Sequence, residues 1–346
     1  MTCRPAWVVA LLMTACSART PALPAVHVLH GEAFGTTWSV KWVGDSPATE
    51  HDVQSAIVAA LEDVDASMSS WRSDSDLSRA RAAGKPIPVK AETARVVRDA
   101  LAIAQATGGA FDPTVEPLME LWGFRGTKRT TWPTDAEIQA ARDQLGWQRV
   151  RLGRGADGQP TLDTGGTALD LSAIAKGYGV DRVSWALSDL GIADSMVEVG
   201  GEVRVTGRSP TGGWWRLGVD MPTQGLAPGQ ELADVVQVTN GAVATSGNYR
   251  QTFEIAGREV HHTMDPRTGL PSTAHVASAT VLAPDCETAD GWATALMVLG
   301  PDEGLPLVEA RPDLDALVLV PGEGGLVYRT TPGMQRHLAA SDEAPR

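Results

Sequence analysis

Cysteine is scarce in this 346-residue chain, which has only three: Cys3, Cys16 and Cys286. The first two lie in an N-terminal segment with the pattern of a secretory signal, so Cys3 would be removed and Cys16 would carry lipid. Only Cys286 then keeps a free thiol, and an internal disulfide framework is excluded. Because an apolar pattern of helical spacing follows Cys286, we expect a small buried side chain there and not a nucleophile.

Positive charge is also in short supply. The chain has 29 Lys and Arg residues against 42 Asp and Glu residues, which gives a formal net charge of -13. Such a protein has no broad field that attracts nucleic acid or anionic lipid, so we expect no nucleic-acid partner. A ligand that contains phosphate would have to be bound by local donors or by a metal ion.

The common nucleotide-binding motifs are missing. No segment matches GxxxxGK[ST], so the P-loop solution to phosphate binding is absent. Gly153, Gly155 and Gly158 fit GxGxxG, but this run leads to Pro160 and a further strand and opens no helix. We therefore predict a hairpin loop at these glycines.

The N-terminal residues predict export. The apolar stretch from Ala6 to Leu12 is too short to cross a membrane as a mature helix, and "MTAC" at its end resembles a bacterial lipobox. An ordinary cleaved signal peptide is the alternative. We predict a signal peptide with a lipobox at 1–16 and a tether at 17–30. The result would be a lipoprotein on the periplasmic side of a bacterial membrane, in contact with the membrane only through the lipid anchor at Cys16.

The remaining chain has a main domain at 31–335 and a tail at 336–346. Alternation predicts an opening strand pair within 27–44, and helical spacing predicts a helix ending near Met68 and others within 91–107, 133–146, 171–191 and 287–300. Thr134 and Glu137 have the spacing of a capping box. Strand runs broken by separated helices favour an α+β, mixed α/β architecture over a doubly wound sheet.

Two segments combine polar residues with expected helix starts. Asp112 precedes Pro113 and is forced towards extended geometry, which suits either simple capping or ligand binding. Asp170 and Ser172 precede a helix that has Lys176 near its start, and such a helix N-terminus can bind an anion. A solvated lysine is the alternative there.

Two further segments could bind a ligand or a cation. His261 and His262 are adjacent and point to opposite sides of a strand, so at most one should face a site, while Asp265 and Arg267 could simply build a turn. Asp290 and Thr294 are four residues apart on a helix, so their oxygens stand side by side and could bind a hard cation. A threonine that bonds back into its own helix is the alternative.

Taken in order, these segments resemble the FAD:protein FMN transferases, or ApbE proteins. The resemblance rests on "GTTW", "MSSWRSDSDLSRAR", "GAFDPTVEPLMELWGF", "LDLSAIAKGYGVD", "VEVGGEVRVTG", "ATSGNYR", "HHTMDPRTGLP" and "TADGWATALMVLG". It implies a two-lobed fold of mainly antiparallel sheets with a ligand cleft between the lobes. It also implies FAD as substrate, a Mg²⁺ ion, and transfer of FMN to a Thr or Ser in the flavinylation motif of an acceptor protein, with release of AMP.

The resemblance also implies roles for single residues. The cation would be held by the carbonyl of Ala173 and the side chains of Asp290 and Thr294, and His262 is our candidate to take the hydroxyl proton. The candidates for contact with FAD are Trp38, Trp71, Ala110, Phe111, Asp112, Asp170, Lys176, Thr245 and Asp265.

The chain departs from the usual family pattern at four of its positions. Trp38 and Trp71 stand where the family more often has Met and Tyr, and either Trp can stack on a flavin or an adenine ring. Asn248 and Glu202 stand where Asp is more frequent. The positioning of these two side chains in the site is therefore open.

Two other functions remain compatible with the sequence. The first is an exported lipoprotein that binds FAD without transfer, or that hydrolyses it to FMN and AMP. The second is a zinc hydrolase built on His261 and His262, although the spaced His and Glu ligands of that chemistry are missing.

Overall fold

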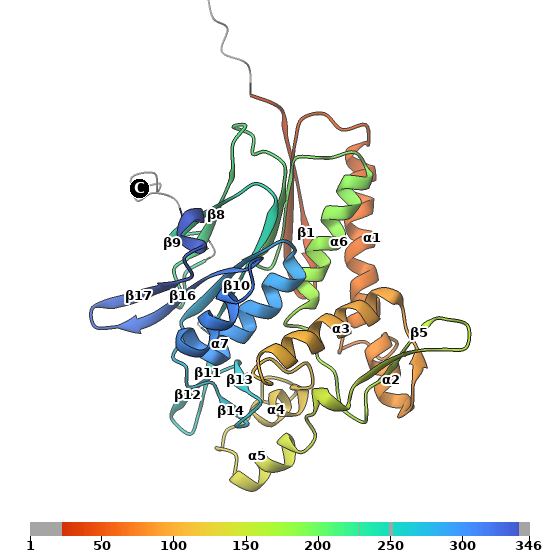
Figure 1. Ribbon diagram of the computed structural model, residues 1–346, viewed down its shortest axis with the longest axis vertical. Coiled ribbons are helices and arrows are strands. Elements are labelled where there is room, and N and C mark those ends of the chain that lie inside the picture. The colour runs from red at the N-terminus through yellow and green to blue at the C-terminus, as the bar shows by residue number, and fades with distance from the viewer. Residues whose placement is uncertain (1–22, 228, 249–251, 339–346) are drawn as a thin grey trace, which may run out of the picture.

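The computed structural model describes residues 23–227, 229–248 and 252–338 (Figure 1). Its centre is an eight-stranded sheet in which every neighbouring pair is antiparallel. In spatial order the strands are β1 (Val26–Ala33), β2 (Thr36–Val43), β6 (Ser195–Val199), β7 (Glu202–Thr206), β10 (Gly241–Gly247), β15 (Ser278–Ala283), β16 (Asp315–Gly322) and β17 (Gly325–Thr330).

Both faces of this sheet are covered. Helices α1 (Glu50–Met68), α6 (Ala175–Asp189) and α7 (Cys286–Glu309) pack on one face, and the hairpin of β8 (Trp215–Asp220) and β9 (Leu232–Val238) packs on the other with α8 (Met334–His337). Strand β10 shows why the sequence allows this. Ala242 and Ala244 pack in the helix-side core while Val243 packs in the hairpin-side core, as the two-residue period of a strand requires.

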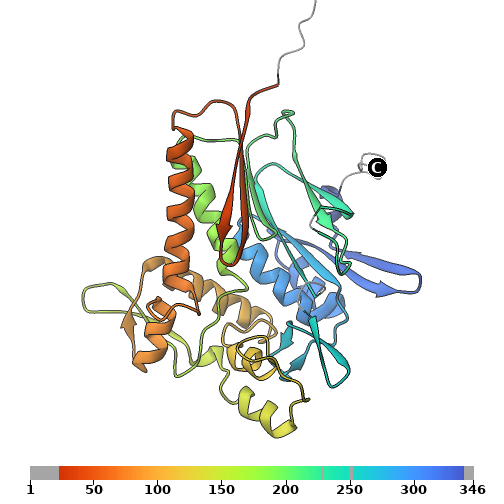
Figure 2. The ribbon, with the colours of Figure 1, turned by 180° about the vertical axis from the view of Figure 1, so that it is seen from behind.

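The rest of the chain forms a second region at one end of the sheet, seen from behind in Figure 2. Two hairpins that leave the sheet between β10 and β15 pack there against α4 and α5, around Trp122, Ile138 and Ile255. The region contains α2 (Asp76–Ala83), α3 (Ala91–Ala106), α4 (Glu116–Leu121), α5 (Asp135–Arg142), a 3₁₀ turn (Trp147–Arg149), β3 (Ile87–Pro88), β4 (Arg151–Arg154), β5 (Pro160–Asp163), β11 (Thr252–Ile255), β12 (Arg258–His261), β13 (Met264–Asp265) and β14 (Leu270–Pro271).

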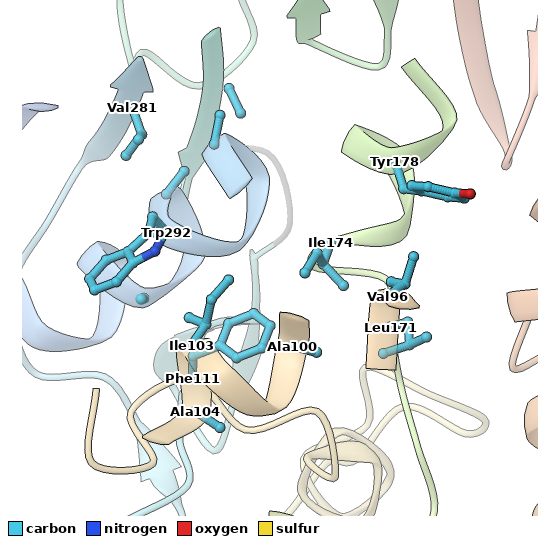
Figure 3. Packing of buried hydrophobic residues seen from close by; sticks show 14 of the residues in the cluster. Val96, Ala100, Ile103, Ala104, Phe111, Leu171, Ile174, Tyr178, Val281 and Trp292 are labelled. Atoms are coloured by element: carbon cyan, nitrogen blue, oxygen red, sulfur yellow. The ribbon is translucent and has the colours of Figure 1, made fainter. Parts of the chain in front are cut away.

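Helix α3 joins this second region to the sheet through a common apolar core (Figure 3). Ile103 of α3 and Ile174 at the start of α6 belong to the same buried cluster as Trp292 of α7 and Phe111. Three segments that are far apart in the sequence are therefore held against one another by burial of apolar surface. The polar site described below lies at their edges.

Several local predictions are confirmed. Thr134 and Glu137 form the capping box of α5, with Glu137 Oε2 2.7 Å from Thr134 N. The glycine run at 153–158 is the β4–β5 hairpin and opens no helix. The helix expected at 287–300 is interrupted at Gly300, where the backbone has φ 70°, before α7 resumes. Cys286 is buried, and the mixed α/β fold with mainly antiparallel sheets is as expected.

The boundaries of the predicted tether and tail differ from the structure. Strand β1 begins at Val26, so part of the predicted tether at 17–30 is paired in the main sheet. Helix α8 and the bridge between Leu338 and Val236 bring residues 336–338 of the predicted tail into the folded body. The predicted signal peptide and Cys16 lie outside the described residues. In the part that is described, none of the helices combines the length and the apolar character needed to cross a membrane.

Candidate functional site

A cavity of about 440 Å³ lies where α6, α7 and β10 meet the second region; we call it the first cavity. The loop after α3 supplies one wall, the end of α4 another, and the turn that follows β12 a third. Its lining includes Trp71, Ala110, Phe111, Asp112, Met119, Phe124, Arg125, Asp170, Ala173, Lys176, Glu202, Thr245, Ser246, His262, Asp290 and Thr294.

One corner of the first cavity concentrates buried charge. Asp290 is 2% exposed; its Oδ2 accepts a hydrogen bond from Gly177 N at 3.0 Å, and its Oδ1 lies 3.5 Å from Lys176 Nζ. The same ammonium lies 2.7 Å from Oε1 of Glu202, which begins β7. Helices α6 and α7 approach closely here because residue 177 is glycine: a Cβ at that position would lie 2.2 Å from the carbonyl oxygen of Cys286.

Burial and charge change the protonation of this corner. Burial raises the pKa of the Glu202 carboxyl to about 7, although the nearby Lys176 ammonium acts in the opposite direction. Burial would lower the pKa of Lys176, but the carboxylates of Asp290 and Glu202 outweigh it and hold that pKa above its usual range. Lys176 is therefore a fixed positive charge beside two acidic groups.

The oxygen atoms of this corner suit a hard cation. Thr294 Oγ1 lies 3.3 Å from Ser246 Oγ, and Ala173, just before α6, lines the same cavity as Thr294 and Asp290. Carboxylate, hydroxyl and carbonyl oxygens are the donors that Mg²⁺ accepts, and Mg²⁺ usually keeps further waters or phosphate oxygens. Within the described ranges no three His, Cys, Asp or Glu side chains gather as a metal site, so carbonyl and hydroxyl donors would have to complete the set.

A second polar group is centred on Arg125, which the sequence reasoning missed. Its Nη2 lies 2.7 Å from Oδ2 of Asp170, and its guanidinium lies 4.6 Å from the ring centroid of Trp71. Asp170 Oδ1 also accepts a hydrogen bond from Ser172 N. Trp71 is 75% exposed, and the Arg125 guanidinium lies over its ring at the cavity wall. Arg125 directly follows the "GAFDPTVEPLMELWGF" segment, which was the available signal.

Asp112 builds the turn before α4 and also faces the cavity. Its Oδ1 accepts hydrogen bonds from the backbone N and Oγ1 of Thr114, at 2.8 and 2.6 Å. Burial raises the pKa of the Asp112 carboxyl, and the hydrogen bonds from Thr114 partly oppose that rise. The preceding Ala110 and Phe111 are buried beside it.

The two histidines separate as their spacing predicts. Nε2 of His261 lies 3.1 Å from the carbonyl oxygen of Ser272, whereas His262 lines the first cavity with its ring 6.3 Å from that of Phe124. This arrangement does not present both imidazoles to one zinc ion. Asp265 does not line the cavity, because its carboxylate is bound by the guanidinium of Arg267 at 3.0 Å.

A second cavity of about 740 Å³ lies between the β1–β2 turn and α1. Trp38 lines this cavity and not the first one, and it packs across from Gly31, where a Cβ would lie 2.4 Å from the indole. Trp71, Ser172 and Lys176 line both cavities. The two hollows therefore adjoin at these three residues.

The structure brings most of the predicted site residues together. Around the first cavity lie Trp71, Ala110, Phe111, Asp112, Asp170, Ala173, Lys176, Thr245, His262, Asp290 and Thr294. Trp38 belongs to the adjoining second cavity, and Asp265 lies behind the wall. Besides Arg125, the sequence reasoning missed Met119 as a lining residue, and it did not predict that Glu202 pairs with Lys176.

Known proteins resemble this chain in sequence and in fold over nearly its whole length. The chain is 35% identical over 336 residues to the FAD:protein FMN transferase of Haemophilus influenzae, covering 94% of each, and 38% identical over 326 residues to that of Vibrio cholerae, covering 92% of this chain and 95% of the relative. The solved flavin transferase ApbE of Vibrio cholerae superposes with a TM-score of 0.80 at 35% identity, over 91% of this chain and all of the other. For the apo flavinyl transferase ApbE of Pseudomonas stutzeri the TM-score is 0.79 at 35% identity, over 92% and 98% of the two chains.

These findings define the protein as an enzyme of the transferase class. The sequence profile described as "ApbE family" matches residues 34–318, so the profile spans the sheet from β2 to β16 and every wall of the first cavity. The chain belongs to the ApbE family.

Proposed function

We propose that the protein transfers the FMN half of FAD to a Thr or Ser hydroxyl of an acceptor flavoprotein, with Mg²⁺, and releases AMP. The observation that carries this proposal is the corner where Ala173, Asp290 and Thr294 line one cavity beside Lys176. The names of the relatives, FAD:protein FMN transferase, supply the reaction to be tested here.

The adjoining cavities suit a dinucleotide. FAD has two ring systems joined by a pyrophosphate, and the two hollows meet at Trp71, Ser172 and Lys176. Each cavity would take one ring system against its apolar lining, such as Phe111 and Met119 in the first and Trp38 in the second. The pyrophosphate would lie at the junction, where the start of the 15-residue helix α6 favours an anion and the Lys176 side chain lines both cavities.

The donor set of the charged corner would hold the cation through the Ala173 carbonyl, the Asp290 carboxylate and the Thr294 hydroxyl. Bound Mg²⁺ supplies neutralisation of the negative charge that develops on the phosphate oxygens, which is worth several kcal/mol. Gly177 N holds Asp290 Oδ2, so the carboxylate is oriented before the ligand arrives.

The chemical step is an exchange at the phosphorus on the FMN side. The acceptor oxygen forms a new bond to that phosphorus, and the bond from phosphorus to the AMP oxygen breaks, so that AMP leaves with the electron pair. His262 would take the hydroxyl proton, because it lines the first cavity and an imidazole titrates near neutral pH. The cavity walls would hold FAD and the acceptor hydroxyl in the geometry of the reaction, and this lowers the barrier because the reactants no longer have to meet and orient in solution.

The place of the reaction is the second part of the proposal. The signal pattern and "MTAC" support export and lipid attachment at Cys16, on the periplasmic side of a bacterial membrane. Exported electron-transfer flavoproteins would then be the acceptors. Replacing Cys16 by Ser should move the protein from the membrane fraction to the soluble fraction; unchanged membrane association would contradict the anchor.

The central test is covalent labelling of an acceptor. Purified protein is incubated with FAD, Mg²⁺ and an acceptor that carries a Thr in an Asp-Gly-Ala-Thr-like sequence, and the products are separated on a denaturing gel. We expect a fluorescent acceptor band that Asp290→Ala reduces by about three orders of magnitude, from a loss of about 4 kcal/mol. Glu303→Gln, at an exposed pair with Arg267, is the control. Release of AMP without a labelled acceptor would instead indicate a pyrophosphatase, and near-normal labelling by Asp290→Ala at saturating Mg²⁺ would refute the cation site.

A further inference from the structure

Glu202 has a geometry that the reaction outlined above does not use. It begins β7, is 4% exposed and lines the first cavity. One carboxylate oxygen, Oε1, lies 2.7 Å from Lys176 Nζ, while Oε2 is buried and makes no hydrogen bond among the described residues. A buried carboxylate oxygen that accepts no hydrogen bond lowers the stability of the folded protein, so its presence calls for a functional explanation.

Lys176 and the proposed cation compete for the carboxylate of the neighbouring Asp290. Gly177 N occupies Oδ2, so Oδ1 is the oxygen that can turn to a cation, and that oxygen is the one facing the Lys176 ammonium. An ammonium that stays on Oδ1 repels an incoming divalent cation at short range, where the interior screens charge poorly. The cation therefore needs the lysine to be drawn aside and neutralised.

The position of Lys176 between the two carboxylates shows that it is drawn away from Asp290. Lys176 Nζ is 2.7 Å from Glu202 Oε1 but 3.5 Å from Asp290 Oδ1, so Glu202 makes the closer ion pair. Lys176 with the two carboxylates has a net charge of -1 when both are ionised, which leaves the charge of Asp290 available. Without the Glu202 charge, the lysine would be left to pair with Asp290.

We propose that Glu202 is a positioning residue for the cation site: it holds and neutralises Lys176 and so leaves Asp290 free to bind Mg²⁺. The inference rests on the Mg²⁺ requirement of the proposed function.

The test is a double-variant comparison of Mg²⁺ affinity in full-length protein solubilised in detergent. The measurement is the rise in melting temperature with Mg²⁺ at an FAD concentration that saturates each variant, which needs no turnover. Glu202→Gln should raise the Mg²⁺ concentration for half of the effect by at least about tenfold. Glu202→Asp, which keeps the charge, should restore affinity to within about threefold of the wild type.

The Lys176→Met background separates positioning from direct ligation. Once the ammonium is gone, Glu202→Gln should change the Mg²⁺ requirement by less than about twofold. An equal loss with and without Lys176 would make Glu202 a direct ligand and overturn the proposal, as would a Glu202→Gln protein with wild-type affinity. Glu303→Gln, an exposed acidic residue, is the matched control.

Failure of the two proposals can be told apart. If Mg²⁺ does not raise the melting temperature of the wild type in the presence of FAD, both the Mg²⁺ requirement and the role of Glu202 are contradicted. If the wild type responds and Glu202→Gln responds equally, only the role of Glu202 is overturned. Melting curves taken without Mg²⁺ show whether each variant is folded.

Discussion

Gly177→Ala tests the close contact of α6 and α7 that holds the charged corner together. The new Cβ would lie 2.2 Å from the Cys286 carbonyl oxygen and 2.9 Å from Asp290 Cβ, and the first of these is backbone that cannot turn away. Overpacking of this kind costs about 1–3 kcal/mol, and a clash with backbone points to about 3. The gain in helix propensity from Gly to Ala is about 1 kcal/mol, so the net loss is about 2 kcal/mol.

The corresponding assay is thermal unfolding followed by circular dichroism, together with a Mg²⁺ titration. A loss of about 2 kcal/mol lowers the melting temperature of a chain of this length by about 3 °C. Mg²⁺ response should weaken as well, because separating the helices stretches the bond from Gly177 N to Asp290. Gly213→Ala is the control: nothing lies within 4 Å of its added Cβ, and its melting temperature should not change. A Gly177→Ala protein with the stability of the wild type would show that the two helices are not this close.

Three further predictions concern single side chains. His262→Ala should transfer FMN slowly while still binding FAD, as measured by flavin fluorescence; loss of FAD binding would place His262 in binding and not in proton transfer. Arg125→Leu should weaken FAD binding by about tenfold and leave saturated turnover nearly unchanged, since it leaves Asp170 unpaired and Trp71 unsupported; an effect confined to turnover would contradict this. Burial raises the pKa of Glu287 from 4.5 to about 8, so the stability linked to its proton is present at low pH and is lost as the pH rises through 8. Glu287→Gln should therefore gain in melting temperature over the wild type as the pH rises from about 4.5 to about 8, with no further gain at higher pH, and a difference independent of pH would refute the assignment.

Local chemistry made much of the secondary structure predictable. The capping box of Thr134 and Glu137, the glycine hairpin at 153–158 and the opening strand pair depend on residues a few positions apart. The order of the main sheet was beyond such reasoning, because β2 pairs with β6 and β10 pairs with β15 across long intervening segments. Which strands pair over such distances is decided by the whole core and not by local pattern.

The candidate site divides in the same way. Its motifs indicated many of the residues that line the first cavity, and the spacing of His261 and His262 predicted that at most one would face it. Arg125 escaped because its importance comes from Asp170 and Trp71, which no sequence spacing relates to it. The pairing of Glu202 with Lys176 was hidden for the same reason, since strand β7 and helix α6 meet only in the folded chain.

The pairing of Trp38 in β2 with Val199 in β6 also bears on how the chain folds. Such a distant pairing closes a large loop, and topologies dominated by such contacts form slowly. The walls of the two cavities come from residues within that loop and from residues that precede or follow it in the chain. A partly synthesised chain therefore lacks part of the walls that would hold a flavin dinucleotide. FAD therefore cannot template the early steps of folding; it acts on the finished protein, which it protects from unfolding in proportion to the logarithm of its concentration.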